Sequence, residues 1–149
     1  MDTLIGRVPL CAVLLLLVAG CKGDDSADVV AVQKSLAEYS RLVLQMDHHR
    51  IAQFYAADGV LENPGHPVRG PESIEQFLRG FDAYKVLAYS AVADTTRVHG
   101  NQADQAGAYR QRVRLPSSDT VDVHGRFRVE WERSHGGWLI RSMSATPER

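Results

Sequence analysis

The residues best able to do chemistry in this chain are its six histidines and two cysteines. Histidine binds metal ions and moves protons near neutral pH, and a cysteine thiolate binds metals or attacks electrophiles. His48 and His49 are adjacent at the start of an expected helix, where neighbouring side chains point about 100° apart. His66, His99 and His135 lie beside glycine or proline and are expected in exposed turns. We therefore expect no metal site and no cofactor.

Cys21 follows a short apolar segment whose pattern is typical of a secretory leader. Arg7 is the only basic residue before an apolar run of 11 residues, 8–18, and the small residues Ala19 and Gly20 precede the cysteine. A membrane span needs about 20 apolar residues, so this run is too short to cross a bilayer. The basic, apolar and small segments in this order indicate a signal peptide.

The sequence VAGC, residues 18–21, resembles the lipobox of bacterial lipoproteins. This resemblance implies that residues 1–20 are removed, that the Cys21 thiol carries diacylglycerol, and that its new amino group is acylated, for example with palmitate. Several acyl chains give stable anchoring because each buried methylene contributes about 0.8 kcal/mol. Lys22 implies the periplasmic side of the outer membrane in a Gram-negative host. An ordinary signal peptide or an uncleaved core helix is the alternative.

The composition predicts one globular domain behind this anchor. The net charge is −1 with both signs interspersed, which argues against a nucleic-acid partner. Cys11 would be lost with the leader and Cys21 would carry lipid, so we expect no disulfide, thiolate nucleophile or cysteine-bound zinc. We divide the chain into a signal peptide (1–20), a lipidated tether (21–28) and a folded domain (29–146).

Helical periodicity dominates the first half of the domain. Apolar residues recur at steps of three and four over 29–46, behind Asp28 as a possible N-cap. Asp47 is expected to cap a second helix that ends at Gly59, and Pro71 to begin a third. The expected buried face of the third helix holds Ile74, Phe77, Leu78 and Phe81.

Alternating residues indicate strands in the second half. After a short strand at 60–63, we expect a long bulged strand at 85–100 and further strands at 106–115, 120–134 and 138–145. Helices followed by hairpins predict an α+β fold with the helices on one face of an antiparallel sheet. On strand 120–134, one face is expected to hold Val121, Val123, Gly125, Phe127, Val129 and Trp131.

Two segments, LQMDHHRIAQFYAADGVLENPGHPVRGPESIEQFL (44–78) and GRFRVEWERSHGGWLIRSM (125–143), resemble the nuclear-transport-factor-2-like superfamily in its SnoaL-like, ketosteroid-isomerase-like branch. The resemblance implies three N-terminal helices packed in the concave face of a strongly curved antiparallel sheet, with a cone-shaped pocket. It also implies a homodimer through the outer sheet face. The matching positions are Asp47, Tyr55, Asp58, Pro64, Gly65, Gly70, Gly125, Trp131, Gly137 and Trp138.

The expected strand faces bear on whether the pocket is catalytic. Enzymes of the superfamily place an aspartate, histidine or tyrosine inside the cone, but His124 has outward parity here, and a one-residue slip near Gly125 would exchange the faces. The remaining candidates are Asp58, which can abstract a proton, and Tyr55 or Tyr109, which can donate one. Their alternative roles are a turn residue for Asp58 and a core aromatic for Tyr55.

Two functions remain open. The favoured one is a lipid-anchored domain that binds a small hydrophobic ligand or acts as an accessory module; the alternative is a cofactor-independent isomerase, dehydratase or cyclase. The outward arginines on strands 106–115 and 120–134 are expected to pair with acids across strands, and contact with lipid phosphates is the other possibility. The expected ligand-binding residues are Phe54, Tyr55, Phe77, Tyr109, Gln111, Val113, Phe127 and Trp131.

Overall fold

The computed structural model describes residues 25–148, so the predicted leader and Cys21 lie outside the described residues. Three helices come first: α1 (Asp25–Gln45), α2 (His48–Gln53) and α3 (Pro71–Arg79). α1 ends where Met46 adopts a φ of 54°. The predicted cap of α2 is confirmed, because the Asp47 carboxylate accepts the N–H of Arg50 at 3.1 Å. Pro71 begins α3, as predicted.

The second helix is shorter than the sequence predicts. It was expected to run to Gly59, but it ends at Gln53, and Tyr55–Glu62 forms strand β1. The Phe54 carbonyl accepts the N–H of Ile140 at 2.6 Å, which brings the chain into the sheet at this point. A Cβ at Gly59 would lie 2.7 Å from the Ile140 carbonyl oxygen, so the glycine permits close approach of two strands.

The remaining strands are β2 (Val68–Arg69), β3 (Lys85–His99), β4 (Gln102–Arg114), β5 (Thr120–Ser134) and β6 (Gly137–Pro147). The six strands form one sheet in the order β2-β1-β6-β5-β4-β3. Neighbouring strands pair antiparallel, except that β1 and β6 run parallel. The predicted irregularity of the first long strand is confirmed by register shifts at Val86/Ala88 and Ala93/Thr95.

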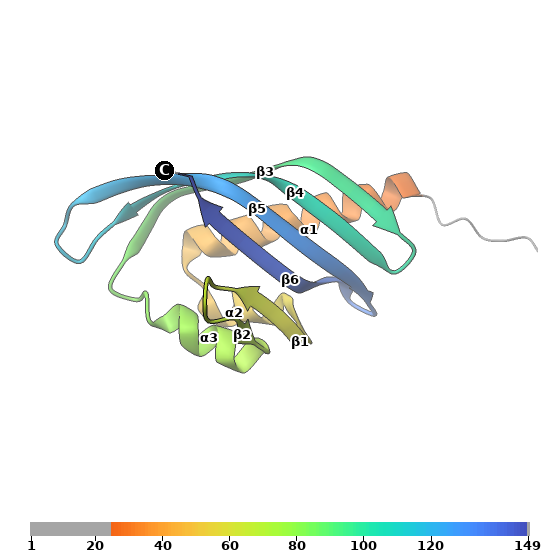
Figure 1. Ribbon diagram of the computed structural model, residues 1–149, viewed down its shortest axis with the longest axis horizontal. Coiled ribbons are helices and arrows are strands. Elements are labelled where there is room, and N and C mark those ends of the chain that lie inside the picture. Colours follow the sequence, from red (N-terminus) through yellow and green to blue (C-terminus); the bar gives the residue numbers. More distant parts are fainter. Residues whose placement is uncertain (1–24, 149) are drawn as a thin grey trace, which may run out of the picture.

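The long strands curve over α1, and α2 and α3 lie beyond it on the same side of the sheet (Figure 1). α1 runs against β3 and buries a stripe at helical spacing in the core beneath the sheet. The start of α1 is tied to the sheet by an ion pair between Asp28 and Arg133, whose guanidinium also stacks over Trp138 at 4.6 Å. The buried stripe comprises Val32, Leu36, Tyr39 and Leu42. Because the helices lie on one side of a mainly antiparallel sheet, the fold is α+β, as predicted.

The predicted strand faces are confirmed on β5. Pairing between β4 and β5 continues without a register shift from Gln102↔Glu132 to Arg114↔Thr120, so no slip occurs near Gly125. His124 is exposed on the outer face. On the inner face, Gly125, Phe127, Val129 and Trp131 are buried. Among the described residues, no helix is long and apolar enough to cross a bilayer.

Candidate functional site: a cavity inside the cone

A cavity of about 560 Å³ lies between the helices and the inner face of the sheet. Its wall is mostly apolar and aromatic, and the polar groups in it are few: one histidine, one asparagine, one glutamine and four tyrosines. This volume and this balance are typical of sites for small organic molecules. The polar lining residues are Tyr39, His48, Asn63, Tyr84, Tyr89, Tyr109 and Gln111.

Partly exposed apolar residues mark the opening of this cavity. Phe81 is 44% exposed and Val121 is 36% exposed, and both line the cavity. The expectation that Phe81 belongs to the buried face of α3 is wrong, because the helix ends at Arg79 and the ring follows the Gly80 cap. The Phe81 ring instead contacts Phe77 at a centroid distance of 5.5 Å and Tyr84 at 5.8 Å, so aromatic rings form one side of the opening.

Half of the expected ligand-binding residues line the cavity. These are Phe77, Tyr109, Gln111 and Val113.

The other four expected ligand-binding residues do not line the cavity. They belong to the buried core or pack against it: Phe54, Tyr55, Phe127 and Trp131. Phe127 and Trp131 are buried in the same core cluster as the α1 stripe, and Phe54 packs edge-on against Tyr39 at 6.0 Å. The Trp131 indole N–H donates to the side-chain oxygen of buried Gln105 at 3.2 Å. Tyr55 is also buried, at 2% exposure, outside the cavity lining.

The structure corrects the expected role of Asp58. The hypothesis of a base at this position needs its carboxylate to face the cavity, but Asp58 is exposed on β1 and does not line it. Two strand neighbours on either side are buried while residues 57 and 58 face solvent. The Asp58 backbone carbonyl accepts a hydrogen bond from Arg69 at 3.1 Å.

The Tyr55 hydroxyl contacts other buried side chains of the core. Its hydroxyl lies 3.4 Å from the Tyr39 hydroxyl and donates to the Met143 sulfur at 3.6 Å. Burial raises the pKa of Tyr55 well above its ordinary value, so this phenol stays protonated at neutral pH. The Asp58–Tyr55 pair is therefore not assembled at the cavity.

A histidine of the cavity wall contacts an exposed carboxylate that is distant from it in the sequence. His48, the first residue of α2, is one of the lining residues, and its side chain is only 10% exposed. Its Nδ1 lies 3.1 Å from a carboxylate oxygen of Asp82, which follows α3. The sequence signal for this site was the Asp47 cap, which indicates where α2 begins. No local pattern indicated that Asp82 would lie next to His48.

Tyrosine hydroxyls complete the polar part of the wall. Burial raises the pKa of Tyr89, and burial together with the charge of Glu148 raises the pKa of Tyr109. Both phenols therefore remain protonated near neutral pH and can donate hydrogen bonds to an acceptor inside the cavity. Among residues 25–148, no group of three or more histidine, cysteine or acidic side chains is arranged to hold a metal ion.

Comparison with known proteins places this geometry in a family. A curved sheet wrapped around helices, with a cavity in the cone, defines the nuclear-transport-factor-2-like fold. Residues 24–144 match the SnoaL-like domain, and the chain belongs to the SnoaL-like family. The comparison with curated proteins gave no match.

Solved structures share the fold at low sequence identity. A protein of unknown function from Mycobacterium tuberculosis has a TM-score of 0.74 at 16% identity, over 83% of this chain and 78% of its own. A ketosteroid isomerase-like protein from Erwinia carotovora atroseptica has a TM-score of 0.74 at 12% identity, over 82% and 97%. A nuclear-transport-factor-2-like protein from Novosphingobium aromaticivorans has a TM-score of 0.65 at 17% identity, over 80% and 81%. These identities show the fold alone.

Proposed function

We propose that this protein is a lipid-anchored envelope protein whose cone cavity binds a small hydrophobic molecule. The observation that carries the proposal is the cavity of about 560 Å³ with an apolar and aromatic wall. A site of this size takes a small organic molecule and buries most of its surface. Burial of the ligand's apolar surface contributes about 25 cal/mol per Å², which supplies the affinity.

The polar groups of the wall favour a ligand with a hydrogen-bond acceptor. The protonated hydroxyls of Tyr89 and Tyr109 donate, and the Gln111 amide both donates and accepts. A ring compound with a carbonyl or hydroxyl group satisfies these donors while its hydrocarbon part contacts Phe77 and Val113. A purely aliphatic ligand leaves them unpaired and is expected to bind more weakly.

The anchor supports a position for the cavity relative to the membrane. Asp25, where α1 begins, is four residues from Cys21, a span of at most about 14 Å. The β4–β5 turn, beside the cavity residues Leu115 and Val121, lies at the opposite end of the sheet from the start of α1 (Figure 1). A lipid on Cys21 would therefore leave the opening facing the aqueous compartment, from which the ligand would enter.

Ligand binding is tested by filling the cavity. Val113→Phe adds a ring to a residue that lines the cavity, whereas Val92→Phe adds the same ring to a residue that is 65% exposed on β3. We expect an environment-sensitive naphthalene dye, and cyclic ketones that displace it, to bind the wild type and V92F but to bind V113F at least about tenfold more weakly. Equal binding by all three, or no binding, would leave only the accessory-module interpretation.

The His48–Asp82 contact favours a second candidate function, a cofactor-independent proton-transfer reaction. With Nδ1 donating to Asp82, the other ring nitrogen is free to take a proton from a carbon next to a ligand carbonyl. The negative charge then moves to the carbonyl oxygen, where a tyrosine hydroxyl stabilises it, and the proton returns to the same or another carbon. This is the chemistry of an isomerase, with His48 in the place that was predicted for Asp58.

The adjacent histidine, His49, provides the control for His48. His49 is exposed and binds Glu75 at 2.9 Å on the surface, so His49→Gln should leave the reaction unchanged. His48→Gln should abolish enzyme-dependent hydrogen–deuterium exchange at the α-carbon of a bound cyclic ketone while binding persists. Asp82→Asn should lower the exchange rate more than the affinity, and Asp82→Glu should partly restore it. Absence of exchange in a wild type that binds the ketone contradicts catalysis but leaves the binding function intact.

A further inference from the structure

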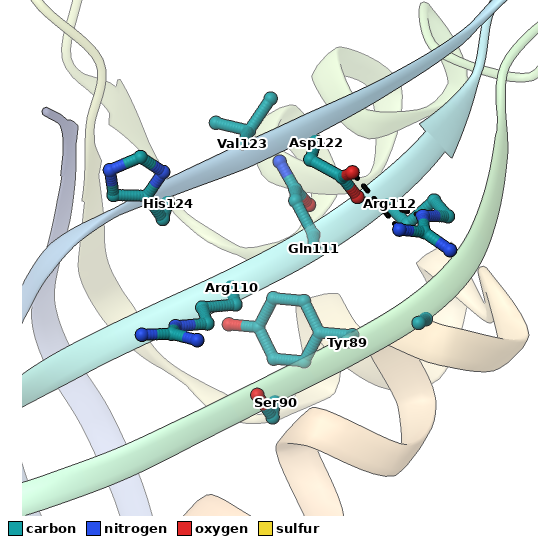
Figure 2. Close-up of a pocket in the computed structure, with 9 residues that line it drawn as sticks. Tyr89, Ser90, Arg110, Gln111, Arg112, Asp122, Val123 and His124 are labelled. Carbon is teal, nitrogen blue, oxygen red and sulfur yellow. Dashed lines mark hydrogen bonds and ion pairs between the residues drawn. The ribbon is translucent and has the colours of Figure 1, made fainter. Parts of the chain in front are cut away.

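A second hollow lies on the outer face of the sheet, opposite the cone cavity. It is a groove of about 590 Å³ over β3, β4 and β5, and Figure 2 shows its side chains with the helices behind the sheet. Small residues on β3, Ala88 and Ser90, leave space beside the long arginines of β4. Arg110, Arg112 and Asp122 line this groove, whereas no described lysine, arginine or acidic residue lines the cavity.

Two cross-strand rows of side chains make up the groove. In one row, Arg112 pairs with Asp122 through two hydrogen bonds of 2.8 and 3.0 Å, which confirms the expected cross-strand pairing at this position (Figure 2). The guanidinium lowers the pKa of the Asp122 carboxyl, and the charges of the pair cancel. This row offers no net charge to a ligand.

The neighbouring row holds three donors that are not satisfied by the protein. Ser90 lies opposite Arg110, and Arg110 lies opposite His124, on adjacent strands. Within the described residues, none of these three side chains makes a hydrogen bond or ion pair, although Arg126 one row further pairs with Asp94 on β3. The row therefore carries an uncompensated guanidinium with a hydroxyl on one side and an imidazole on the other.

We propose that this groove binds the phosphate group of an organic phosphate, held by Arg110 with Ser90 and His124. A guanidinium presents a planar fork of N–H groups that matches two phosphate oxygens, and the hydroxyl and imidazole supply donors for the remaining oxygens. The strands that carry Ser90 and His124 lie about 5 Å to either side of Arg110, so the three side chains surround one oxyanion. The groove volume exceeds that of a phosphate alone and leaves room for an organic substituent.

The phosphate can come from a lipid headgroup or from a soluble ester. The chemistry of recognition is the same, so the experiment has two arms: calorimetric titration with phenyl phosphate and inorganic phosphate, and sedimentation with vesicles of phosphatidylglycerol or of phosphatidylcholine alone. Binding of phenyl phosphate without vesicles assigns a soluble ester. Binding of phosphatidylglycerol vesicles that phenyl phosphate displaces assigns a lipid headgroup. Either result supports the site.

Arg114 provides the matched control for Arg110. It is exposed on the same face of β4, lies outside the groove and makes no ion pair among the described residues. We expect Arg110→Gln to weaken phosphate binding about tenfold or more, as the loss of a charged hydrogen bond does, and Arg114→Gln to weaken it less than twofold. Equal loss in both variants, or no binding of any probe by the wild type, overturns the proposal.

The two sites are separable by experiment. Tyr89, Gln111 and Val123 line both hollows because the sheet between them is one layer thick, but Val113 lines only the cavity. Val113→Phe should therefore leave phosphate binding unchanged, and R110Q should leave dye binding unchanged. Failure of the groove does not affect the proposed function of the cavity.

Discussion

At the scale of single residues, the chemistry of the cavity depends on which polar groups its wall contains. Asp58 has the right chemistry but faces solvent, whereas His48 lines the cavity and contacts Asp82. The Asp47 cap predicts that α2 begins at His48. Its partner Asp82, however, lies 34 positions further along the chain in a turn, and no local sequence pattern indicates such a contact. The inward tyrosines, by contrast, follow from strand alternation, so Tyr109 was predictable.

The buried tyrosines predict a loss of stability at high pH. Burial raises the pKa of Tyr39 and Tyr89 in the folded protein above the value near 10 that they have when unfolded. A raised phenol pKa gives stability that is complete below about pH 10 and is lost as the pH rises further, because only the unfolded chain ionises easily. Urea unfolding should therefore show a falling free energy above about pH 10.

Tyr89→Phe isolates the tyrosine contribution from that of lysines, which titrate in the same range. The variant should lose less stability between about pH 9 and 11 than the wild type does. Identical slopes for the two proteins would contradict the assignment of the alkaline loss to this buried phenol.

At the scale of elements, the sequence identified strands and helices best where the periodicity was long. The 15 residues of β5 agree with the predicted strand at both ends, because alternation continues over its whole length. The prediction for the α2–β1 junction was wrong, because Ile51, Phe54 and Tyr55 match the apolar spacing of a helix. Pairing of this segment with β6, a contact distant in sequence, determines its structure.

Gly59 tests this account of β1. Gly59→Ala would place a Cβ 2.7 Å from the Ile140 carbonyl oxygen and 3.0 Å from backbone atoms of Ala56, so β1 must shift from β6. We expect a loss of about 1–3 kcal/mol in the free energy of unfolding by urea. Gly136→Ala is the control: its Cβ would meet nothing within 4 Å, so its effect should stay within about 0.5 kcal/mol. A neutral G59A variant contradicts the requirement for close strand approach.

At the scale of the whole molecule, the two faces of one sheet have different characters. The inner face encloses an apolar cavity, and the outer face carries charged rows with Val92, Ala106 and Ala108 between them. The homodimer expected through the outer face would cover the phosphate groove, so the two uses compete. If both occur, phenyl phosphate should shift the sedimentation of the protein from dimer to monomer.

The proposed lipid anchor predicts a specific N-terminus. Mass spectrometry of the protein extracted from cell envelopes should find Cys21 as the first residue, carrying diacylglycerol and an amide-linked acyl chain. Cys21→Ala should remain unprocessed and lack the lipid mass. An unmodified Cys21 in the wild type would refute the anchoring and leave the folded domain's properties unchanged.

The most direct test of ligand binding in the cone is native mass spectrometry of the protein purified from its own host without detergent exchange. We expect a non-covalent adduct of one small, organic-extractable molecule per chain, present in the wild type and V92F and absent from V113F. Wild-type protein that carries no adduct and accepts none from a host lipid and metabolite extract would contradict it.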